Sequence, residues 1–205
     1  MRRLVIDTAT RACSVALFKG NDCIAAFHED IGRGHAERLV PMVAELPERG
    51  KADSIHVNVG PGSFTGIRVG VSAARALALA WGAECHGYGC LDLIAAMARG
   101  DEAMAVDVTM TGGHGEFYFQ NFDASGEPTD PPQSLPPETA ADLSSAACVA
   151  GDVAERIIAL RGFGQAAALL PDARHWALLA GKPLLPARPF YVRGPDAKLP
   201  GGRIP

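Results

Sequence analysis

Gly60-Pro61-Gly62-Ser63-Phe64-Thr65-Gly66-Ile67-Arg68-Val69-Gly70 is the stretch that decides the fold, because it joins a predicted strand to a predicted helix. The alternating apolar residues Ile55, Val57 and Val59 before it are typical of a strand, and an Ala-rich helix follows it. A glycine-rich turn at a helix N-terminus collects free backbone N–H groups and the positive end of the helix dipole, which suits an anion. The stretch lacks the lysine of a nucleoside-triphosphate P-loop, and Pro61 breaks the dinucleotide-binding pattern.

Two interpretations of this loop stay open. One is a vestigial phosphate-type site, in which an acidic residue at the end of the first strand would organise Mg²⁺ and hydroxyl groups would touch phosphate. Its members would be Asp7, Thr8, Gly60, Gly62, Ser63 and Gly66. The other is a tight turn that packs a helix on a sheet, with Asp7 capping a turn through local side-chain bonds.

Composition limits the function classes. The chain has 205 residues, 48% of them hydrophobic, and a formal net charge of −4, which argues against a protein that grips nucleic acid alone through a basic surface. Five scattered cysteines favour reduced thiols over a disulfide framework. The N-terminus turns polar at Asp7, and no uncharged apolar run reaches about 18 residues. We therefore expect a cytoplasmic protein without a signal peptide or a membrane span.

The order of predicted elements suggests a duplicated α/β unit. Patterning predicts strands at 4–8, 13–18, 23–29, 55–59 and 84–88, and helices at about 35–46, 64–81 and 91–100. A second series follows: strands at 104–108, 116–122 and 147–150, helices at 151–160 and 172–181, a mobile Pro-rich loop at 130–137, and a last apolar segment at 184–193. The tail 194–205 shows no packing pattern.

We thus expect a two-lobed α/β fold, with an N-terminal lobe at 1–103 and a shortened, divergent lobe at 104–205. A strand ending in Asp-Thr, followed later by a Gly-rich loop before a helix, is similar to the layout of the actin, hexokinase and Hsp70 (ASKHA) superfamily. A likeness of fold does not by itself give a function.

The residues that could carry chemistry are few. His35 opens the first predicted helix, but the position one turn later, where a second metal-binding histidine would stand, is Leu39. His114 lies in a Gly-rich turn beside Glu116, where an exposed turn is the simpler interpretation. No Ser/His/Asp order or nucleophile elbow is present. The sequence therefore predicts no catalytic residues, no metal and no cofactor.

Three motifs resemble those of the TsaB (YeaZ) family, whose older labels are glycoprotease-like protein and M22 peptidase homologue. They are Asp7-Thr8-Ala9-Thr10 with Ser14-Val15-Ala16-Leu17, the stretch from His35 to Met42, and the glycine stretch from Gly60 to Gly70; Tyr191-Val192-Arg193 adds a shorter match. The resemblance covers residues 1 to about 98 and weakens in the second half. It implies a non-catalytic partner subunit in bacterial threonylcarbamoyladenosine modification of tRNA, beside the anticodon.

The same resemblance implies the partners. Such a subunit pairs with TsaD, the catalytic paralogue that binds metal through paired histidines; a small ATPase, TsaE, joins the pair, and self-association through the same surface is possible. tRNA would be met only through the complex. The implied interface lies on the helices at about 35–46 and 64–81, and we expect the contact residues His35, Leu39, Met42, Val43, Gly66, Gly70, Ala73, Ala74 and Leu77. Gly70→Arg or Ala74→Glu is then expected to break the heterodimer while the monomer still folds.

One departure from the family and two rival functions remain. Many relatives carry a basic pair before Gly-Glu-Val-Tyr, whereas the loop 109–116 of this chain has no lysine or arginine and has His114 before Gly115-Glu116. That difference puts in doubt any tRNA or TsaE contact carried over to this loop. The main alternative function is an active small phosphotransferase or carbamoyltransferase of the same fold, resting on Asp7, Thr8 and the glycine loop. A peptidase is the weaker rival, because nothing in the sequence supports proteolysis.

Overall fold

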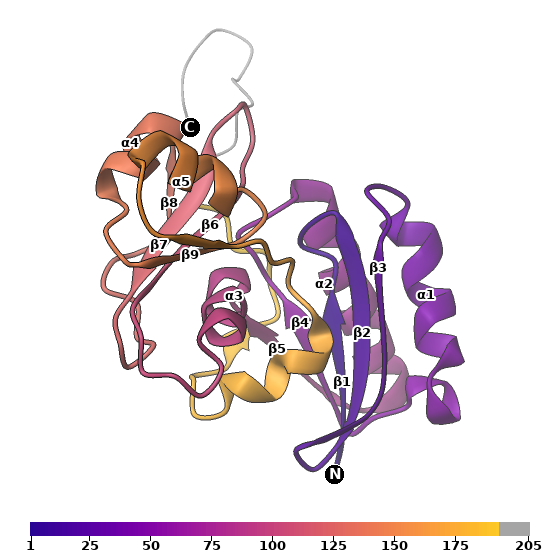
Figure 1. The fold of residues 1–205 in the computed structure, drawn as a ribbon. Coiled ribbons are helices and arrows are strands. Elements are labelled where there is room, and N and C mark those ends of the chain that lie inside the picture. Colours follow the sequence, from indigo (N-terminus) through magenta and orange to yellow (C-terminus); the bar gives the residue numbers. More distant parts are fainter. Residues whose placement is uncertain (193–205) are drawn as a thin grey trace, which may run out of the picture.

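The computed structural model describes residues 1–192, which form two α/β lobes (Figure 1). The first lobe is built on a six-stranded sheet in the order β11-β5-β4-β1-β2-β3. Its strands are β1 (Arg2–Asp7), β2 (Ala12–Lys19), β3 (Asp22–Asp30), β4 (Ser54–Asn58), β5 (Glu84–Tyr88) and β11 (Leu185–Pro186). Its helical elements are α1 (His35–Glu45), α2 (Phe64–Trp81), α3 (Cys90–Arg99) and the 3₁₀ turns η1 (Pro47–Gly50) and η2 (Ala173–Leu179).

The second lobe repeats this arrangement with shorter elements. Its sheet has the order β10-β9-β6-β7-β8, and its strands are β6 (Val106–Thr111), β7 (Phe117–Phe122), β8 (Gln133–Leu135), β9 (Cys148–Ala150) and β10 (Gln165–Ala167). Helices α4 (Pro137–Leu143) and α5 (Ala154–Arg161) complete it. In both lobes the first strand pairs antiparallel with the second and parallel with the fourth. The expected duplicated, two-lobed ASKHA-like fold is confirmed.

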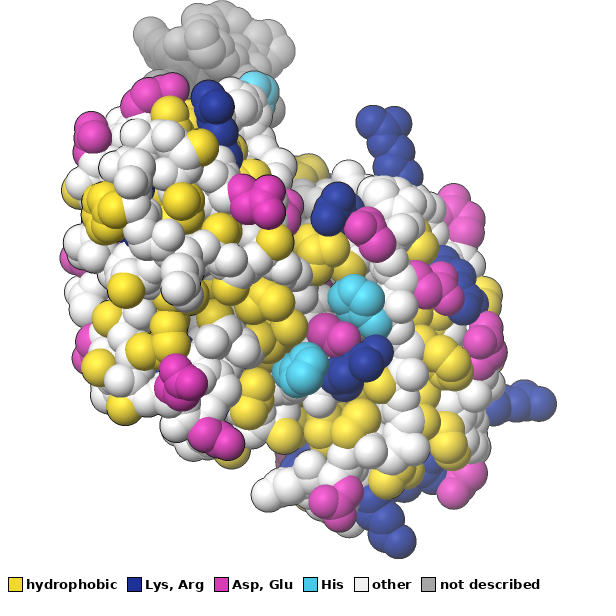
Figure 2. All heavy atoms as spheres, in the orientation of Figure 1, with side chains coloured by type: hydrophobic (Ala, Val, Ile, Leu, Met, Phe, Trp, Pro, Cys, Tyr) yellow, Lys and Arg dark blue, Asp and Glu magenta, His cyan; other side chains and the backbone are white. Residues whose placement is uncertain are grey.

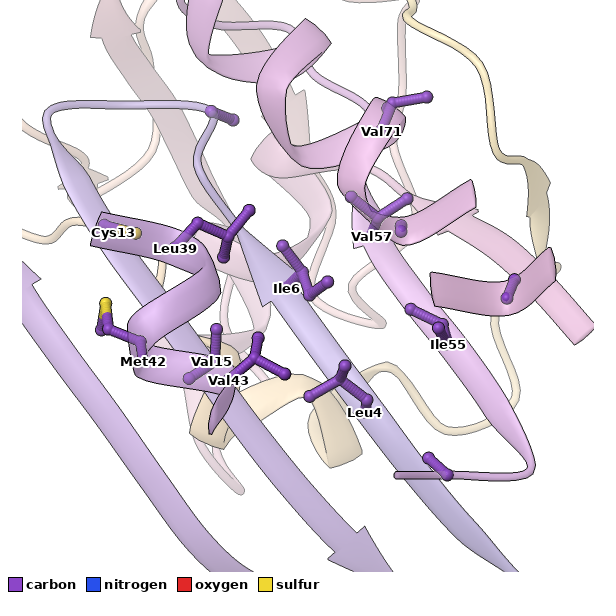
Figure 3. Close-up of a cluster of buried hydrophobic side chains, with 14 of the residues drawn as sticks. Leu4, Ile6, Cys13, Val15, Leu39, Met42, Val43, Ile55, Val57 and Val71 are labelled. Carbon is purple, nitrogen blue, oxygen red and sulfur yellow. The ribbon is translucent and has the colours of Figure 1, made fainter. Parts of the chain in front are cut away.

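Each sheet is covered on both faces, which follows from the apolar residues that alternate along its strands. On one face of the first sheet, Leu4, Ile6 and Val15 pack against α1 and α2 (Figure 3). On the other face, Val5, Ala16 and Phe18 pack against α3 and η2. Helix α3 also packs against β6 through Leu91 and Ile94. It therefore lies between the two sheets and joins the lobes (Figure 1).

The second lobe, expected at 104–205, is not continuous to the end of the described chain. After β10 the chain returns to the first lobe, where η2 packs on β1, β2 and β3 and β11 pairs with β5. Among the described residues, the second lobe therefore extends to about residue 167, and the segment 173–186 packs with the first lobe. In this returning segment, η2 covers the second face of the first sheet and β11 forms its edge strand. These are long-range contacts, which local sequence patterns do not predict.

Three smaller expectations also change. The loop at 130–137, expected to be mobile, holds β8 and the start of α4, and the short strand β10 was not predicted. The helix expected at 172–181 is the 3₁₀ element η2. The expectation for the tail 194–205, and Arg193 of the shorter match Tyr191-Val192-Arg193, lie outside the described residues. The remaining predicted elements are present, with ends shifted by a few residues at most.

Candidate functional site

A cleft of about 920 Å³ separates the two lobes. The first lobe contributes the β1–β2 turn, the glycine loop and the start of α2; the second contributes the β6–β7 hairpin and the loop before α5. Its lining residues include Thr10, Arg11, Gly62, Ser63, Phe64, Arg68, Thr111, His114, Tyr118, Asp152 and Tyr191. The cleft is thus the place to test whether the glycine loop meets a ligand.

The glycines of the loop let α2 lie directly against the end of β1. The Thr8 hydroxyl donates a hydrogen bond of 2.7 Å to the carbonyl oxygen of Gly66. A Cβ on Gly66 would overlap the carbonyl oxygen of Thr8, and a Cβ on Gly70 would overlap the Thr8 hydroxyl. Gly66, Gly70 and Thr8 are therefore engaged in helix–strand packing.

Asp7 is buried and saturated by neighbours rather than open to the cleft. Its carboxylate accepts hydrogen bonds from Asn58 Nδ2 at 2.6 Å, from the Tyr88 hydroxyl at 3.0 Å and from the backbone N–H of Ala9 at 3.1 Å. Burial raises the pKa of Asp7 to about 6, although these three donors act in the opposite direction. Asp7 therefore does not stand where a magnesium-organising carboxylate would need to stand.

The chain itself covers the start of the glycine loop. Phe190 donates its backbone N–H to Val59 O at 2.8 Å, and a Cβ on Gly60 would lie 2.9 Å from the carbonyl oxygen of Phe190. Gly60 has φ +108°, and its N–H donates to Asn58 Oδ1 at 2.8 Å. Of the six residues expected to form a phosphate-type loop, only Gly62 and Ser63 line the cleft, and Ser63 caps α2 by accepting from Gly66 N.

Sequence reasoning missed the cationic side of the cleft. The Arg68 guanidinium lies 3.5 Å from the Phe64 ring centroid, and Arg68 Nε donates to the Tyr191 hydroxyl at 2.8 Å. Arg11 also lines the cleft and lies 3.4 Å from Asp30. Phe64 and Arg68 are four residues apart on α2, so helix periodicity could have paired them. The fold alone brings Tyr191 to them, from 123 residues along the chain.

The second lobe supplies the opposite wall through the divergent loop 109–116. Asp152 accepts hydrogen bonds from Thr111 N at 2.8 Å and from Thr111 Oγ1 at 2.9 Å. These bonds fix the end of β6 to the loop that precedes α5. His114, interpreted as part of an exposed turn, lies among the lining residues with φ +57°. The hairpin therefore faces the cleft, a placement the sequence did not predict.

The expected partner-contact residues are mostly inside the lobe. Leu39, Met42 and Val43 point from α1 toward the strands (Figure 3), and Gly66, Gly70 and Ala74 lie on the buried side of α2. These six are corrected from contact residues to core residues, because the same apolar stripe that suggested an interface is used to pack the helices on the sheet. His35, Ala73 and Leu77 are half-buried, and His35 Nε2 lies 3.2 Å from Ala12 O.

The outward side of these two helices also carries exposed apolar side chains, beside exposed charged residues such as Glu37 and Arg75. Val40 is 57% exposed and Leu79 is 87% exposed. They stand among small exposed residues, and we call this set the outer helix face: Ala36, Val40 and Ala44 on α1, and Ser72, Ala76 and Leu79 on α2. Exposed apolar residues grouped on one side of a folded chain are candidates for an interaction surface.

Two further features of residues 1–192 concern metal binding and membrane insertion. Within that range no three His, Cys, Asp or Glu side chains gather closely enough to hold a metal ion. Among the same residues no helix is both long and apolar enough to cross a bilayer. On the face shown in Figure 2, acidic and basic side chains are scattered, and neither sign forms a large patch.

Comparisons with known proteins agree on one family. The family model for TsaD, the tRNA N6-adenosine threonylcarbamoyltransferase, matches residues 27–134. The tRNA threonylcarbamoyladenosine biosynthesis protein TsaB of Escherichia coli is 38% identical over 131 residues, which are 60% of this chain and 55% of that protein. The chain spans about half the length of the first curated relatives it matches.

Solved structures support both the family and the fold. YeaZ from Pseudomonas aeruginosa superposes with a TM-score of 0.77 at 30% identity, covering 93% of this chain and 99% of that one. The ethanolamine utilization protein EutJ from Carboxydothermus hydrogenoformans has a TM-score of 0.51 at 11% identity, covering 87% of this chain and 89% of the other. The second likeness concerns the fold alone.

Proposed function

This chain belongs to the TsaB (YeaZ) group of the tRNA N6-adenosine threonylcarbamoyltransferase family, and on that premise we propose that it acts in tRNA threonylcarbamoyladenosine biosynthesis as a non-catalytic partner subunit. Its main partner would be a TsaD-type paralogue, with a TsaE-type ATPase joining the pair. The chain would also be able to form a homodimer through the surface that binds the TsaD-type paralogue. The modification would take place in the cytoplasm, and this chain would contact tRNA only as part of the complex.

The observation that carries the proposal is the outer helix face. Its exposed Val40 and Leu79 lie off the buried core stripes of α1 and α2. The core therefore holds both helices in place whether or not a partner is bound. Burying such a face beneath two partner helices would give an interface of the standard size of about 1,600 Å². The apolar centre and small flanking residues suit close helix packing.

Two further observations support a non-catalytic role. Asp7 and Thr8 are bound within the first lobe, and Gly60 lies beneath Phe190, so most of the presumed phosphate loop is used for packing. The first-helix position that would supply a second metal-binding histidine is Leu39, a core residue. These arrangements favour a scaffold that has kept the fold of an enzyme without its reactive groups.

The rival function, an active phosphotransferase or carbamoyltransferase, has one observation in its favour. The cleft holds Arg11 and Arg68, which could meet an anionic ligand. Calorimetry with Mg-ATP distinguishes the two. The scaffold proposal expects no binding at micromolar concentration, whereas a Kd of about 1 μM, or about −8 kcal/mol, would favour the enzyme.

The proposal itself is tested by co-expression with the TsaD-type paralogue from the same genome. An affinity tag on this chain should retain the paralogue, and the eluted pair should run as one species in size-exclusion chromatography with light scattering. The tagged chain carrying Val40→Glu is the matched variant and should elute alone. If the tagged wild-type chain, like the Val40→Glu variant, failed to retain the paralogue, the proposed function would be contradicted.

A further inference from the structure

The turn between β7 and β8 is tightly built from its own groups. The Asp123 carboxylate accepts from Ser125 N at 2.8 Å, from Ser125 Oγ at 2.6 Å and from Glu127 N at 3.1 Å. Backbone bonds from Asp123 N to Glu127 O and from Gly126 N to Asp123 O close it. Residues 123–127 therefore form a closed turn, and Thr129 N, which donates to Asn121 O at 3.0 Å, ties the chain after it to β7.

Two cations from elsewhere in the chain converge on this turn. Arg99, the last residue of α3, donates from Nη2 to Ala124 O at 2.7 Å, and a Cβ on Gly126 would overlap its guanidinium. Lys182 Nζ donates to Gly126 O at 2.7 Å and pairs with Glu127 Oε1 at 2.7 Å. The turn is thus held by a guanidinium and an ammonium from two separate segments.

Those two segments flank the two places where the described chain passes between the lobes. The outgoing connection, 100–105, begins directly after Arg99, whose Nε also donates to Met104 O at 3.0 Å. The returning connection, 168–172, leads into η2, and Lys182 follows three residues after η2 ends. Each crossing is therefore tied to the same turn of the second lobe. Lys182 is also close enough to Asp92, at the start of α3, to influence the pKa of that carboxyl.

The turn and the cleft lie at opposite ends of one hairpin. Tyr118, near the start of β7, and Thr111, at the end of β6, line the cleft, while β7 ends at Phe122, next to the turn. Six strand residues span about 20 Å. A small rotation of the second lobe about the crossings would therefore displace the hairpin at the cleft.

We propose that Arg99 and Lys182, bound to the turn 123–127, form a latch that sets the angle between the two lobes and thereby the width of the cleft. The Lys182–Glu127 ion pair of the latch is partly exposed, with side chains 27% and 64% exposed, while Arg99 and Lys182 also donate to backbone carbonyl oxygens. High salt therefore weakens the ion pair. This inference does not depend on the proposed function.

Amide hydrogen exchange of the whole chain tests the latch. The variants are Arg99→Met and Lys182→Met, alone and combined, with Lys51→Met at an exposed site as the matched control. We expect the combined variant to exchange at least about three-fold faster at the cleft residues 111–113, with the α2 core amides unchanged. In wild-type protein at 1 M salt, where the screening length is about 3 Å, exchange at residues 111–113 should also become faster. In the combined variant, salt should not increase the exchange rate further.

Two results would overturn the latch. Faster exchange confined to residues 123–128 would reduce these contacts to local support of a turn. Faster exchange throughout, α2 included, would mean that the variants lower global stability rather than release the lobes. Because the salt experiment uses unmodified protein, an unchanged cleft at 1 M salt would refute the proposal even if a variant failed to fold.

Discussion

The hydroxyl of Thr8, at the end of β1, donates a 2.7 Å hydrogen bond to the carbonyl oxygen of Gly66 in the first turn of α2. One turn further along, Gly70 offers no side chain, so the same hydroxyl fits against the helix. This contact explains why two glycines stand in a helix interior, where each costs about 1 kcal/mol relative to alanine. The glycine motif is primarily a packing device.

Gly70→Ala should therefore destabilise the chain, although alanine favours helices. The added methyl overlaps the Thr8 hydroxyl, and overpacking of this kind typically costs about 1–3 kcal/mol. Urea unfolding followed by circular dichroism measures the change. In a Thr8→Ala background the cost should shrink, and an equal loss in both backgrounds would show that the methyl meets something other than Thr8. Gly70→Arg and Ala74→Glu are now expected to unfold the monomer rather than break a complex.

Asp7 should make the chain more stable as pH falls from about 6 to about 4. Its pKa is about 6 in the fold against 3.8 for the ordinary group, so within this window the folded state holds a proton that the unfolded state has lost. The effect is at most about 3 kcal/mol. Urea unfolding of wild type and Asp7→Asn at several pH values isolates it. Identical pH slopes for the two proteins would show that Asp7 is ionised in the fold near pH 5.

His56 should act with the opposite sign in an overlapping window. It lies buried beside His86, Trp176 and Ser54, and burial lowers its pKa to about 4 from 6.5. The unfolded state therefore binds a proton first as pH falls, and stability from this group is lost between about pH 6.5 and 4. His56→Gln should remove this loss, so that the stabilising trend of Asp7 becomes visible. NMR titration of the His56 ring checks the assignment: a midpoint near 6.5 would contradict it.

Arg161 should be the most sensitive charged residue of the second lobe. Its buried side chain lies 3.4 Å from Asp107 Oδ2 and donates to Ser144 Oγ and Ala146 O. Arg161→Met leaves a buried carboxylate without its cation, which costs about 3–5 kcal/mol. Arg156→Met, at an exposed position of the same helix, is the control and should change stability by less than about 0.5 kcal/mol. Equal effects of the two variants in urea would refute the role of the buried pair.

Much of the first lobe could be predicted from sequence because its elements carry strong local signals. The expected bounds of α2 and β5 match the structure, and alternating apolar residues announced β1 to β4. The three-residue strands β8 and β10 were not predicted, whereas β9, equally short, is a continuous apolar run that the sequence did indicate. The return of η2 and β11 to the first lobe depends on long-range pairing, so a cut at residue 103 was the natural but incomplete prediction.

The candidate site was harder to predict for a related reason. Leu39 and Met42 on α1, and Ala74 on α2, belong to apolar stripes. Such a stripe predicts that a helix face is buried, but it does not identify the surface that buries it. Here the cover is the chain's own sheet. The outer helix face is marked instead by Val40 and Leu79, which lie off that stripe. Likewise, Asp7 and Thr8 are buried by Tyr88 and Gly70, contacts that only the fold creates.

The most direct test of the account is the affinity of purified chain for the TsaD-type paralogue, measured by calorimetry for wild type, Leu79→Glu and Leu178→Glu. Leu79 lies on the outer helix face, whereas Leu178, 42% exposed on η2, lies on the opposite side of the first sheet. We expect Leu79→Glu to raise Kd at least about 100-fold, or about 2.7 kcal/mol, with unchanged circular dichroism, and Leu178→Glu to bind as wild type does. Unchanged affinity of Leu79→Glu for a paralogue that binds wild type would contradict the central claim.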